Sequence, residues 1–416
     1  MNTIAWIILI ALILEFALHW TAGMLNLSHL KAPLPDEFHA CYDAKRYRRS
    51  QSYLRDNTRF DWVSTGIHLL TLLGFWFAGG FPWVDLQIRS LGWGTLASGV
   101  LYIVVLMALN SLLSLPFQFY ATFVIEARYG FNRTTLATFV IDRLKGAILG
   151  LLLGVPLIGG ILYFFETSGD HAWWYAWLTV IFFMLVIQYI APTWIMPLFN
   201  RFEPLADGAL KRAIMDYAAS IRFPLQNVFI MDGSKRSAKS NAFFTGFGRN
   251  KRIVLFDTLV NQHSTEELVA VLGHEMGHYK QHHILVGLLI RIFQTGLMFF
   301  LLSLCISQPS LFEAFKMSHM SIYAGLIFFG LLYTPIDFFA GLLAMMVSRR
   351  NEFDADRFAM QTTGSGEAMI NALKTLSVSH LSNLTPHPFY VFLNYSHPPV
   401  MARIAALRAG MSKSTA

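Results

Sequence analysis

A histidine pair with a glutamate beside it is the part of this sequence best suited to chemistry. The segment His274-Glu275-Met-Gly-His278 is an H-E-x-x-H motif. Residues four apart share one face of a helix, so the two histidines can present ring nitrogens to one metal ion. Glu275 then stands where it can take a proton from a metal-bound water. The motif predicts one zinc ion per chain and hydrolytic chemistry.

Two histidines do not complete a catalytic zinc site, which needs three protein ligands. The longer H-E-x-x-H-x-x-G-x-x-H spacing is absent, so the third ligand must come from elsewhere. Glu352 is the better candidate. It follows the seventh apolar segment directly, and the H-E-x-x-H motif directly precedes the sixth apolar segment. If these two segments form a hairpin, Glu352 meets His274 and His278. Asp356 lies one turn further and can orient a ligand imidazole. The alternative is an ordinary charged helix face after a membrane exit.

Peptide hydrolysis also needs a donor for the oxyanion that forms on the scissile carbonyl. His397, in Tyr395-Ser-His-Pro-Pro, and Arg403 are candidates for this task. Each of them alone is more often structural. We therefore expect Glu275 to move the proton, and His397 and Arg403 to assist it.

The composition places these residues in a polytopic membrane protein. The chain has 416 residues, of which 55% are hydrophobic and only 14% charged, against about 25% charged in soluble proteins. The net charge of +7 is expected from basic loops that set membrane topology, and no motif for nucleic-acid binding accompanies it. Seven segments are long and apolar enough to span a bilayer: about 4–25, 61–80, 94–120, 146–165, 173–195, 284–305 and 321–347.

Basic residues alternate between the two sides of these predicted spans. They gather in 31–59, in 122–145 and directly after the last span, whereas the loops between carry few. The positive-inside rule then places the N-terminus outside, and the active site and C-terminus in the cytoplasm. The N-terminal apolar segment lacks a basic start and a cleavage site, which favours a retained span over a signal peptide.

We expect four parts along the chain. They are a membrane region with five spans and basic loops, a catalytic segment, two further spans and a helical C-terminal segment with the third ligand: 1–196, 197–283, 284–347 and 348–416.

The catalytic segment is expected to contain a small β-hairpin ahead of the motif helix. Its strands are Asn241–Phe247 and Arg252–Phe256, with a turn over Gly248–Lys251. Ser264 and Glu267 form a possible capping box at the start of the motif helix.

Taken together, these residues resemble the type I CAAX prenyl endopeptidases, a family of integral-membrane zinc proteases. The resemblance covers nearly the whole chain and extends beyond H-E-x-x-H. The matching blocks are Ile125–Thr135 with Phe139 and Asp142, Pro197–Phe202, Ser240–Phe247, Ile253–Leu259, Glu352-Phe-Asp-Ala-Asp356, and His397 with Arg403.

The resemblance implies zinc on His274, His278 and Glu352, and Glu275 as the catalytic acid/base. It implies supporting roles for Asp356, His397 and Arg403. It also implies that the substrate backbone contacts the edge strand that begins with Asn241, Ala242 and Phe243. The expected fold is an all-α membrane protein of seven helices around a large chamber, with a zinc protease domain at the cytoplasmic end. Short outer loops and the C-terminus favour a bacterial inner-membrane member over one of the endoplasmic reticulum.

Three functions remain open on this evidence. The first is cleavage near the C-terminus of isoprenylated proteins, with peptide and membrane lipid as partners. The second is a quality-control protease of broad specificity. The third is a transporter or channel with a structural zinc site, in which Glu275 would have no chemical task. The sequence does not predict the oligomeric state.

Overall fold

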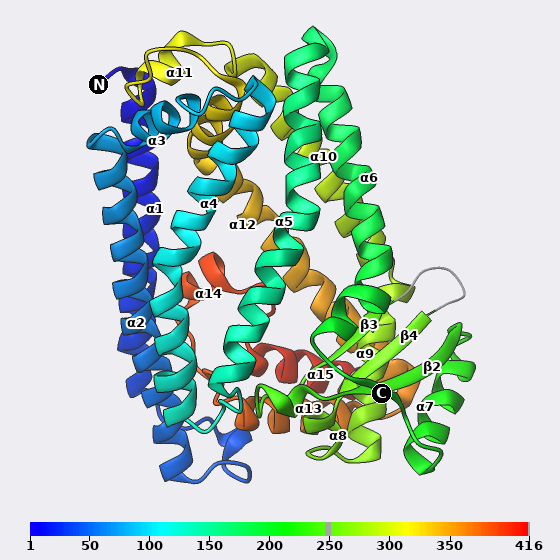
Figure 1. The fold of residues 1–416 in the computed structure, drawn as a ribbon. Coiled ribbons are helices and arrows are strands. Elements are labelled where there is room, and N and C mark those ends of the chain that lie inside the picture. The colour runs from blue at the N-terminus through cyan, green and yellow to red at the C-terminus, as the bar shows by residue number, and fades with distance from the viewer. Residues whose placement is uncertain (246–250, 415–416) are drawn as a thin grey trace.

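The computed structural model describes residues 1–245 and 251–414. Long helices run side by side along most of the molecule, and a smaller domain with a sheet lies at the end away from the N-terminus (Figure 1). Most of the predicted turn, from Gly248 to Asn250, lies outside the described residues.

The predicted spans are confirmed as helices. In the described residues, six helical segments are long and apolar enough to cross a bilayer, and a bent pair is the seventh. The six contain the helices α1 (Thr3–Ser28), α4 (Thr95–Tyr120), α5 (Leu136–Thr167), α6 (Ala172–Ile190), α10 (His283–Cys305) and α12 (Ile322–Thr363). The bent pair is α2 (Ala44–Phe77) and α3 (Gly80–Arg89), which meet at 63°. Gly79 lies at this break with a φ of +79°, a conformation that glycine adopts without a steric penalty.

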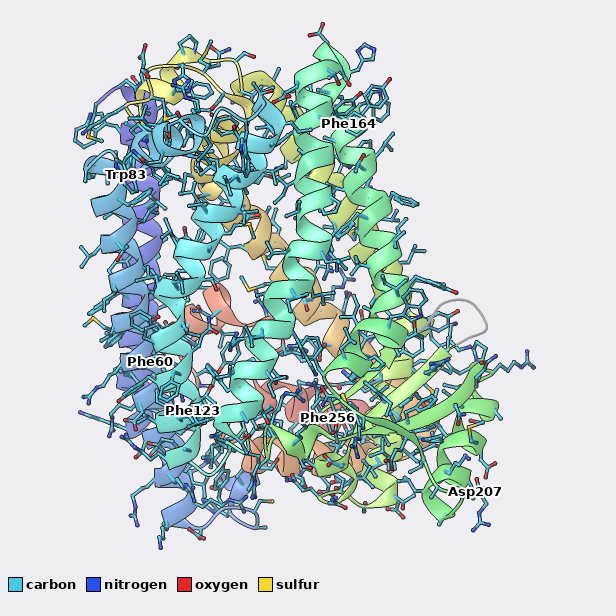
Figure 2. The ribbon with its side chains drawn as sticks, viewed as in Figure 1. Phe60, Trp83, Phe123, Phe164, Asp207 and Phe256 are labelled. Atoms are coloured by element: carbon cyan, nitrogen blue, oxygen red, sulfur yellow. The ribbon has the colours of Figure 1, made fainter. Side chains whose placement is uncertain are left out.

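The helical region faces outward with apolar side chains. In the six spans, at most 22% of the most apolar window is buried. Large side chains such as Leu152 and Phe182 are 68% and 70% exposed, and Figure 2 shows side chains projecting along the outer sides of the long helices. Such a surface is stable in lipid, where apolar side chains meet hydrocarbon rather than water.

The domain at the other end contains a four-stranded mixed sheet in the order β1-β2-β4-β3. The hairpin prediction is confirmed, because β3 (Ala242–Thr245) pairs antiparallel with β4 (Lys251–Phe256). The rest of the sheet was not predicted: β2 (Leu225–Met231) runs parallel to β4, and β1 (Phe202–Pro204) pairs antiparallel with β2. The order makes β3 an edge strand.

The motif helix α9 (Thr265–Lys280) packs between this sheet and α12. Its predicted capping box is confirmed. The Ser264 side chain accepts a hydrogen bond from the backbone N–H of Glu267, and the Glu267 side chain accepts one from the backbone N–H of Ser264. At Gly277 an added Cβ would lie 3.3 Å from the Cα of Ala355 in α12. The small residue therefore lets the two helices that carry the metal ligands approach closely.

One difference concerns α12, which we expected to end near residue 347. It continues without interruption to Thr363, 42 residues in all, or about 63 Å at 1.5 Å per residue. Because the hydrocarbon core is only about 30 Å thick, the last turns extend well beyond it and carry Glu352 into the catalytic domain. The remaining helices are α7 (Ala209–Ser220), α8 (Asp257–Val260), α11 (Pro309–Glu313), α13 (Gly366–Ser379), α14 (Pro388–Asn394) and α15 (Val400–Ser414).

Candidate metal centre

Two ring nitrogens and a carboxylate converge where α9 meets α12. The Nε2 atoms of His274 and His278 lie 3.2 Å apart. Glu352 completes the group, with Oε2 at 3.5 Å from His274 Nε2 and Oε1 at 3.3 Å from His278 Nε2. In the part of the chain that the structure describes, this is the one group of three or more such side chains whose ligand atoms lie within 4.8 Å of one another.

The spacing and the chemistry of these donors fit a divalent metal. Ligand atoms at about 2.0–2.1 Å from a tetrahedral ion lie about 3.3 Å apart, which matches the observed separations. Glu352 is 3% exposed, and its Oε2 atom accepts no hydrogen bond. A buried carboxylate oxygen without a hydrogen bond is costly, and a metal ion at this position would satisfy it.

Asp356 orients the first imidazole, at the position where the sequence predicted such a contact. Its Oδ1 lies 2.8 Å from His274 Nδ1, which leaves Nε2 directed at Glu352. Arg403 holds Asp356 in turn with two hydrogen bonds of 2.7 and 2.6 Å. Burial alone lowers the pKa of His274, but its contacts with Asp356 and Glu352 raise it to about 9. The contact of Asp356 with Nδ1 fixes the ring with Nε2 toward Glu352, the orientation that a metal ligand requires.

His283 orients the second imidazole, a contact that the sequence analysis missed. The Nδ1 atoms of His278 and His283 lie 3.1 Å apart, so one of them must carry the proton. If His278 Nε2 binds a metal, its Nδ1 carries the hydrogen and donates it to His283. The signal was the histidine at the first position of α10, five residues after His278.

Glu275 lines the same pocket as two of the ligands, His274 and Glu352. The pocket has a volume of about 610 Å³, and both Glu275 and His274 line it. Burial raises the pKa of Glu275 above its ordinary value. A carboxylate with a raised pKa is a stronger base at neutral pH, which suits a group that accepts and returns a proton.

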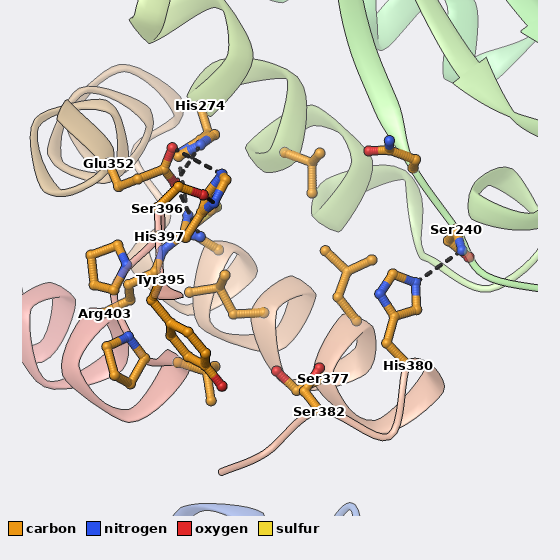
Figure 3. Close-up of a pocket in the computed structure, with 18 of the residues that line it drawn as sticks. Ser240, His274, Glu352, Ser377, His380, Ser382, Tyr395, Ser396, His397 and Arg403 are labelled. Carbon is orange, nitrogen blue, oxygen red and sulfur yellow. Dashed lines mark hydrogen bonds and ion pairs between the residues drawn. The ribbon is translucent and has the colours of Figure 1, made fainter. Parts of the chain in front are cut away.

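The two remaining candidates for catalysis differ in exposure (Figure 3). The side chain of His397 is 63% exposed, and its Nε2 lies 3.3 Å from Glu352 Oε1. The side chain of Arg403 is only 11% exposed, with Nη1 at 3.3 Å from Glu352 Oε2. His397 is therefore the exposed side chain of the two, whereas Arg403 is largely buried in contact with Glu352 and Asp356.

The predicted substrate strand begins at the pocket. Asn241 and Ala242 line it, and β3 presents a free edge, because β4 is its only partner strand among the described residues. Phe243 points differently: its ring centroid lies 6.4 Å from that of Phe256 in β4.

The sequence analysis also missed the group that fixes the start of this strand. Ser240 N donates a hydrogen bond to His380 Nε2 at 2.9 Å (Figure 3), and Ser240 Oγ donates one to Gln262 at 3.0 Å. His380 follows α13 and belongs to no motif, so nothing local marked it.

An H-E-x-x-H helix and a distant carboxylate, joined through a helix that crosses the bilayer, define an integral-membrane metalloprotease. Two family models agree with this class. A model described as CAAX prenyl protease N-terminal, five membrane helices, matches residues 24–201, and peptidase family M48 matches residues 204–410. The chain therefore belongs to peptidase family M48, a family of metallopeptidases.

Known proteins resemble the chain over nearly its whole length. The CAAX prenyl protease 1 homolog of Oryza sativa subsp. japonica is 34% identical over 393 residues, 92% of each chain. The homolog of Homo sapiens is 32% identical, over 90% of this chain and 88% of its own. The crystal structure of Ste24p from S. mikatae superposes with a TM-score of 0.93 at 30% identity, over 98% of this chain and 99% of that one.

Proposed function

We propose that this protein is a zinc endopeptidase that cleaves near the C-terminus of isoprenylated CAAX-type proteins. The observation that carries the proposal is the convergence of His274, His278 and Glu352, at a pocket that His274, Glu352 and Glu275 line. The printed names of its relatives, CAAX prenyl proteases, supply the substrate class. Two imidazoles and one carboxylate are a ligand set typical of catalytic zinc.

The chain's own residues then divide the work of hydrolysis. When bound, zinc polarises the scissile carbonyl and makes the attacking water more acidic. Glu275 accepts the proton of that water and delivers it to the leaving amine. Asp356 and His283 keep the two imidazoles oriented, as their contacts with His274 and His278 suggest.

His397 is the better of the two candidates to stabilise the oxyanion. Its exposed ring lines the pocket and can donate a hydrogen bond from Nε2. Arg403 is engaged with Asp356 and Glu352 beneath the ligands. We therefore assign His397 to the substrate and Arg403 to holding the carboxylates in position.

The edge strand offers a place for the substrate backbone. An extended peptide can add to the free edge of β3 and pass the metal ligands, with Asn241, Ala242 and Phe243 beside it. Polar side chains within the spans, Glu15 and Asp337 among them, favour a water-filled interior through which the chain end and its lipid reach the pocket.

Topology and domains complete the proposal. We assign residues 1–196 and 284–347 to the membrane, and 197–283 and 348–416 to catalysis. The basic segment 31–59 and the catalytic elements lie at one end of the molecule (Figure 1), which supports a cytoplasmic active site by the positive-inside rule. Relatives in eukaryotes favour the endoplasmic reticulum; the bacterial location remains a prediction from the short outer loops and the C-terminus.

A farnesylated peptide ending in a CAAX sequence tests this proposal. The purified protein should remove its last three residues, and Glu275→Gln should reduce kcat by about 10³-fold with zinc retained. Glu266→Gln, on an exposed turn of the same helix, is the matched control and should keep full activity. An untouched farnesylated peptide together with degradation of an unfolded membrane protein would contradict the substrate and favour the quality-control function.

A further inference from the structure

Four basic side chains line a groove beside the catalytic pocket. They are Lys45, Arg46, Arg48 and Arg49, in the first turns of α2. The groove has a volume of about 660 Å³, a size typical of ligand sites. On a helix these four positions lie within one half of the surface, so their charges act on the same space. Asp43 is the single acidic residue in its lining, which leaves a net charge of +4 − 1 = +3.

These four cations have no acidic partner in the described part of the chain, unlike three other basic residues of the chain. Arg128 bonds Asp56 at 2.7 Å, and Lys374 and Arg408 both bond Glu37. The carboxylate of Asp43 instead accepts a hydrogen bond from the backbone N–H of Arg46 at 2.7 Å, as the N-cap of the helix. Membrane topology would explain why this segment has many basic residues. It does not explain why four basic side chains without an acidic partner line one groove.

Buried aromatic and aliphatic side chains support the groove. Tyr47, between the cations in sequence, is buried on the other face of α2 and packs against Tyr42. Tyr129, Phe131 and Leu381 form a buried apolar cluster that underlies the groove. The site therefore combines rigid apolar walls with a cationic rim.

The groove shares a wall with the catalytic pocket. Residues 376–383 contribute to both hollows: Leu376, Ser377 and His380 line the pocket, whereas Val378, Ser379 and Leu381 line the groove. A polypeptide that lies in the pocket can thus continue over this wall into the groove.

We propose that this groove is an exosite for an acidic stretch of the protein substrate, on the N-terminal side of the cleaved bond. The inference rests on the proposed function, because only the body of a C-terminally cleaved protein extends upstream of the pocket. Four unpaired cations attract carboxylates, and such steering raises affinity through many weak contacts.

A lipid headgroup fits the groove less well. Arg49 is the nearest of the four to Asp61, the first residue of the predicted span, and 12 residues of helix separate them, or about 18 Å. The headgroup layer on one side of a bilayer is only about 5–8 Å thick. The groove therefore lies beyond it, where a soluble polypeptide is the better occupant.

Two farnesylated CAAX peptides test the proposal, one with four glutamates upstream of the cleaved bond and one with four glutamines there. Wild type should show a KM about fivefold lower for the acidic peptide at low salt, and added salt should remove the difference. Arg46→Gln with Arg49→Gln should abolish the preference and leave cleavage of the glutamine peptide unchanged. Arg55→Gln with Arg59→Gln removes the same charge from exposed positions of the same helix outside the groove, and should keep the preference.

Direct binding separates this inference from the proposed function. Fluorescence anisotropy with the Glu275→Gln protein should show tighter binding of the acidic peptide even if neither peptide is cleaved. Equal binding of the two peptides would overturn the exosite, as would a preference that survives in the Arg46/Arg49 double variant. Loss of binding to vesicles with anionic lipid in that variant, without a change for peptides, would assign the groove to the membrane instead.

Discussion

The two ends of α12 carry polar networks of the same residue types with different geometry. At one end, Asp85 is 2% exposed, accepts a hydrogen bond from Tyr323 at 2.5 Å, and lies 3.1 Å from His319 Nε2. At the other end, Glu352 meets two imidazoles whose second nitrogens are held by Asp356 and His283.

The difference lies in how many donor atoms converge. Around Asp85 one imidazole and one carboxylate pair with each other. Around Glu352 three ligand atoms lie within 4.8 Å of one another, and two of the ligands, His274 and Glu352, line an open pocket. Residue type alone therefore does not mark a catalytic site. We expect substitutions at the Glu352 end to affect metal and activity, and those at the Asp85 end to affect stability alone.

Replacing Glu352 by Gln should have the largest effect. A neutral amide is a poor zinc ligand, so the bound metal should fall to roughly a tenth of the wild-type content after dialysis against a chelator. Peptide cleavage should fall by about 10³-fold or more. Atomic absorption and a peptidase assay measure the two losses. Full zinc content in this variant would show that the carboxylate is not a ligand.

Asp356→Asn should have an intermediate effect. The variant keeps the shape of the side chain but weakens its bond to His274, and the loss of such a contact typically reduces metal affinity 10–100-fold. Excess zinc should therefore restore much of the activity, which separates it from Glu352→Gln. Asp354→Asn is the matched control, because Asp354 faces Arg357 on the same helix. Equal zinc affinities of the two variants would contradict the role of Asp356.

Asp85→Asn tests the polar network at the other end of α12. Asp85 also lies 3.4 Å from Arg89, and loss of a buried charged acceptor costs about 2 kcal/mol. The temperature of thermal inactivation should drop, while zinc content and kcat at 25 °C stay at wild-type values. Asp170→Asn, at an exposed site in the turn between α5 and α6, should change none of these. A loss of zinc from Asp85→Asn would contradict the distinction between the two ends.

His380→Gln should have the smallest effect, visible only in acid. Burial lowers the pKa of His380 to about 4, below the ordinary 6.5 or so. The unfolded chain thus binds more protons between these values, and stability falls as pH decreases through this window. Glutamine can accept the bond from Ser240 without titrating. Wild type should lose about 2 kcal/mol more than the variant between pH 7 and pH 5, as thermal inactivation at both pH values would show.

The sequence predicted the parts of this site that depend on local pattern. The H-E-x-x-H helix, its capping box and the hairpin follow from spacing within about 20 residues. Glu352 was predicted because two apolar spans form a hairpin that returns the chain to the same end. Its precise delivery depends on α12 continuing to Thr363, which our boundary near residue 347 did not anticipate.

What the sequence did not predict depends on contacts between distant segments. The strands β2 and β4 are neighbours and parallel in the sheet, although β3 lies between them in the sequence. Parallel pairing leaves no turn signature in sequence. His380 contacts Ser240 over a separation of 140 residues. Such contacts arise from tertiary packing, and neither composition nor periodicity encodes them locally.

Zinc-edge X-ray absorption on the purified Glu275→Gln protein tests the central claim most directly, because this variant should retain the metal. The account predicts one zinc per chain with two imidazole ligands and one carboxylate, and loss of the signal when Glu352→Gln is added. A spectrum with a single imidazole, or one that the second substitution leaves unchanged, would contradict it.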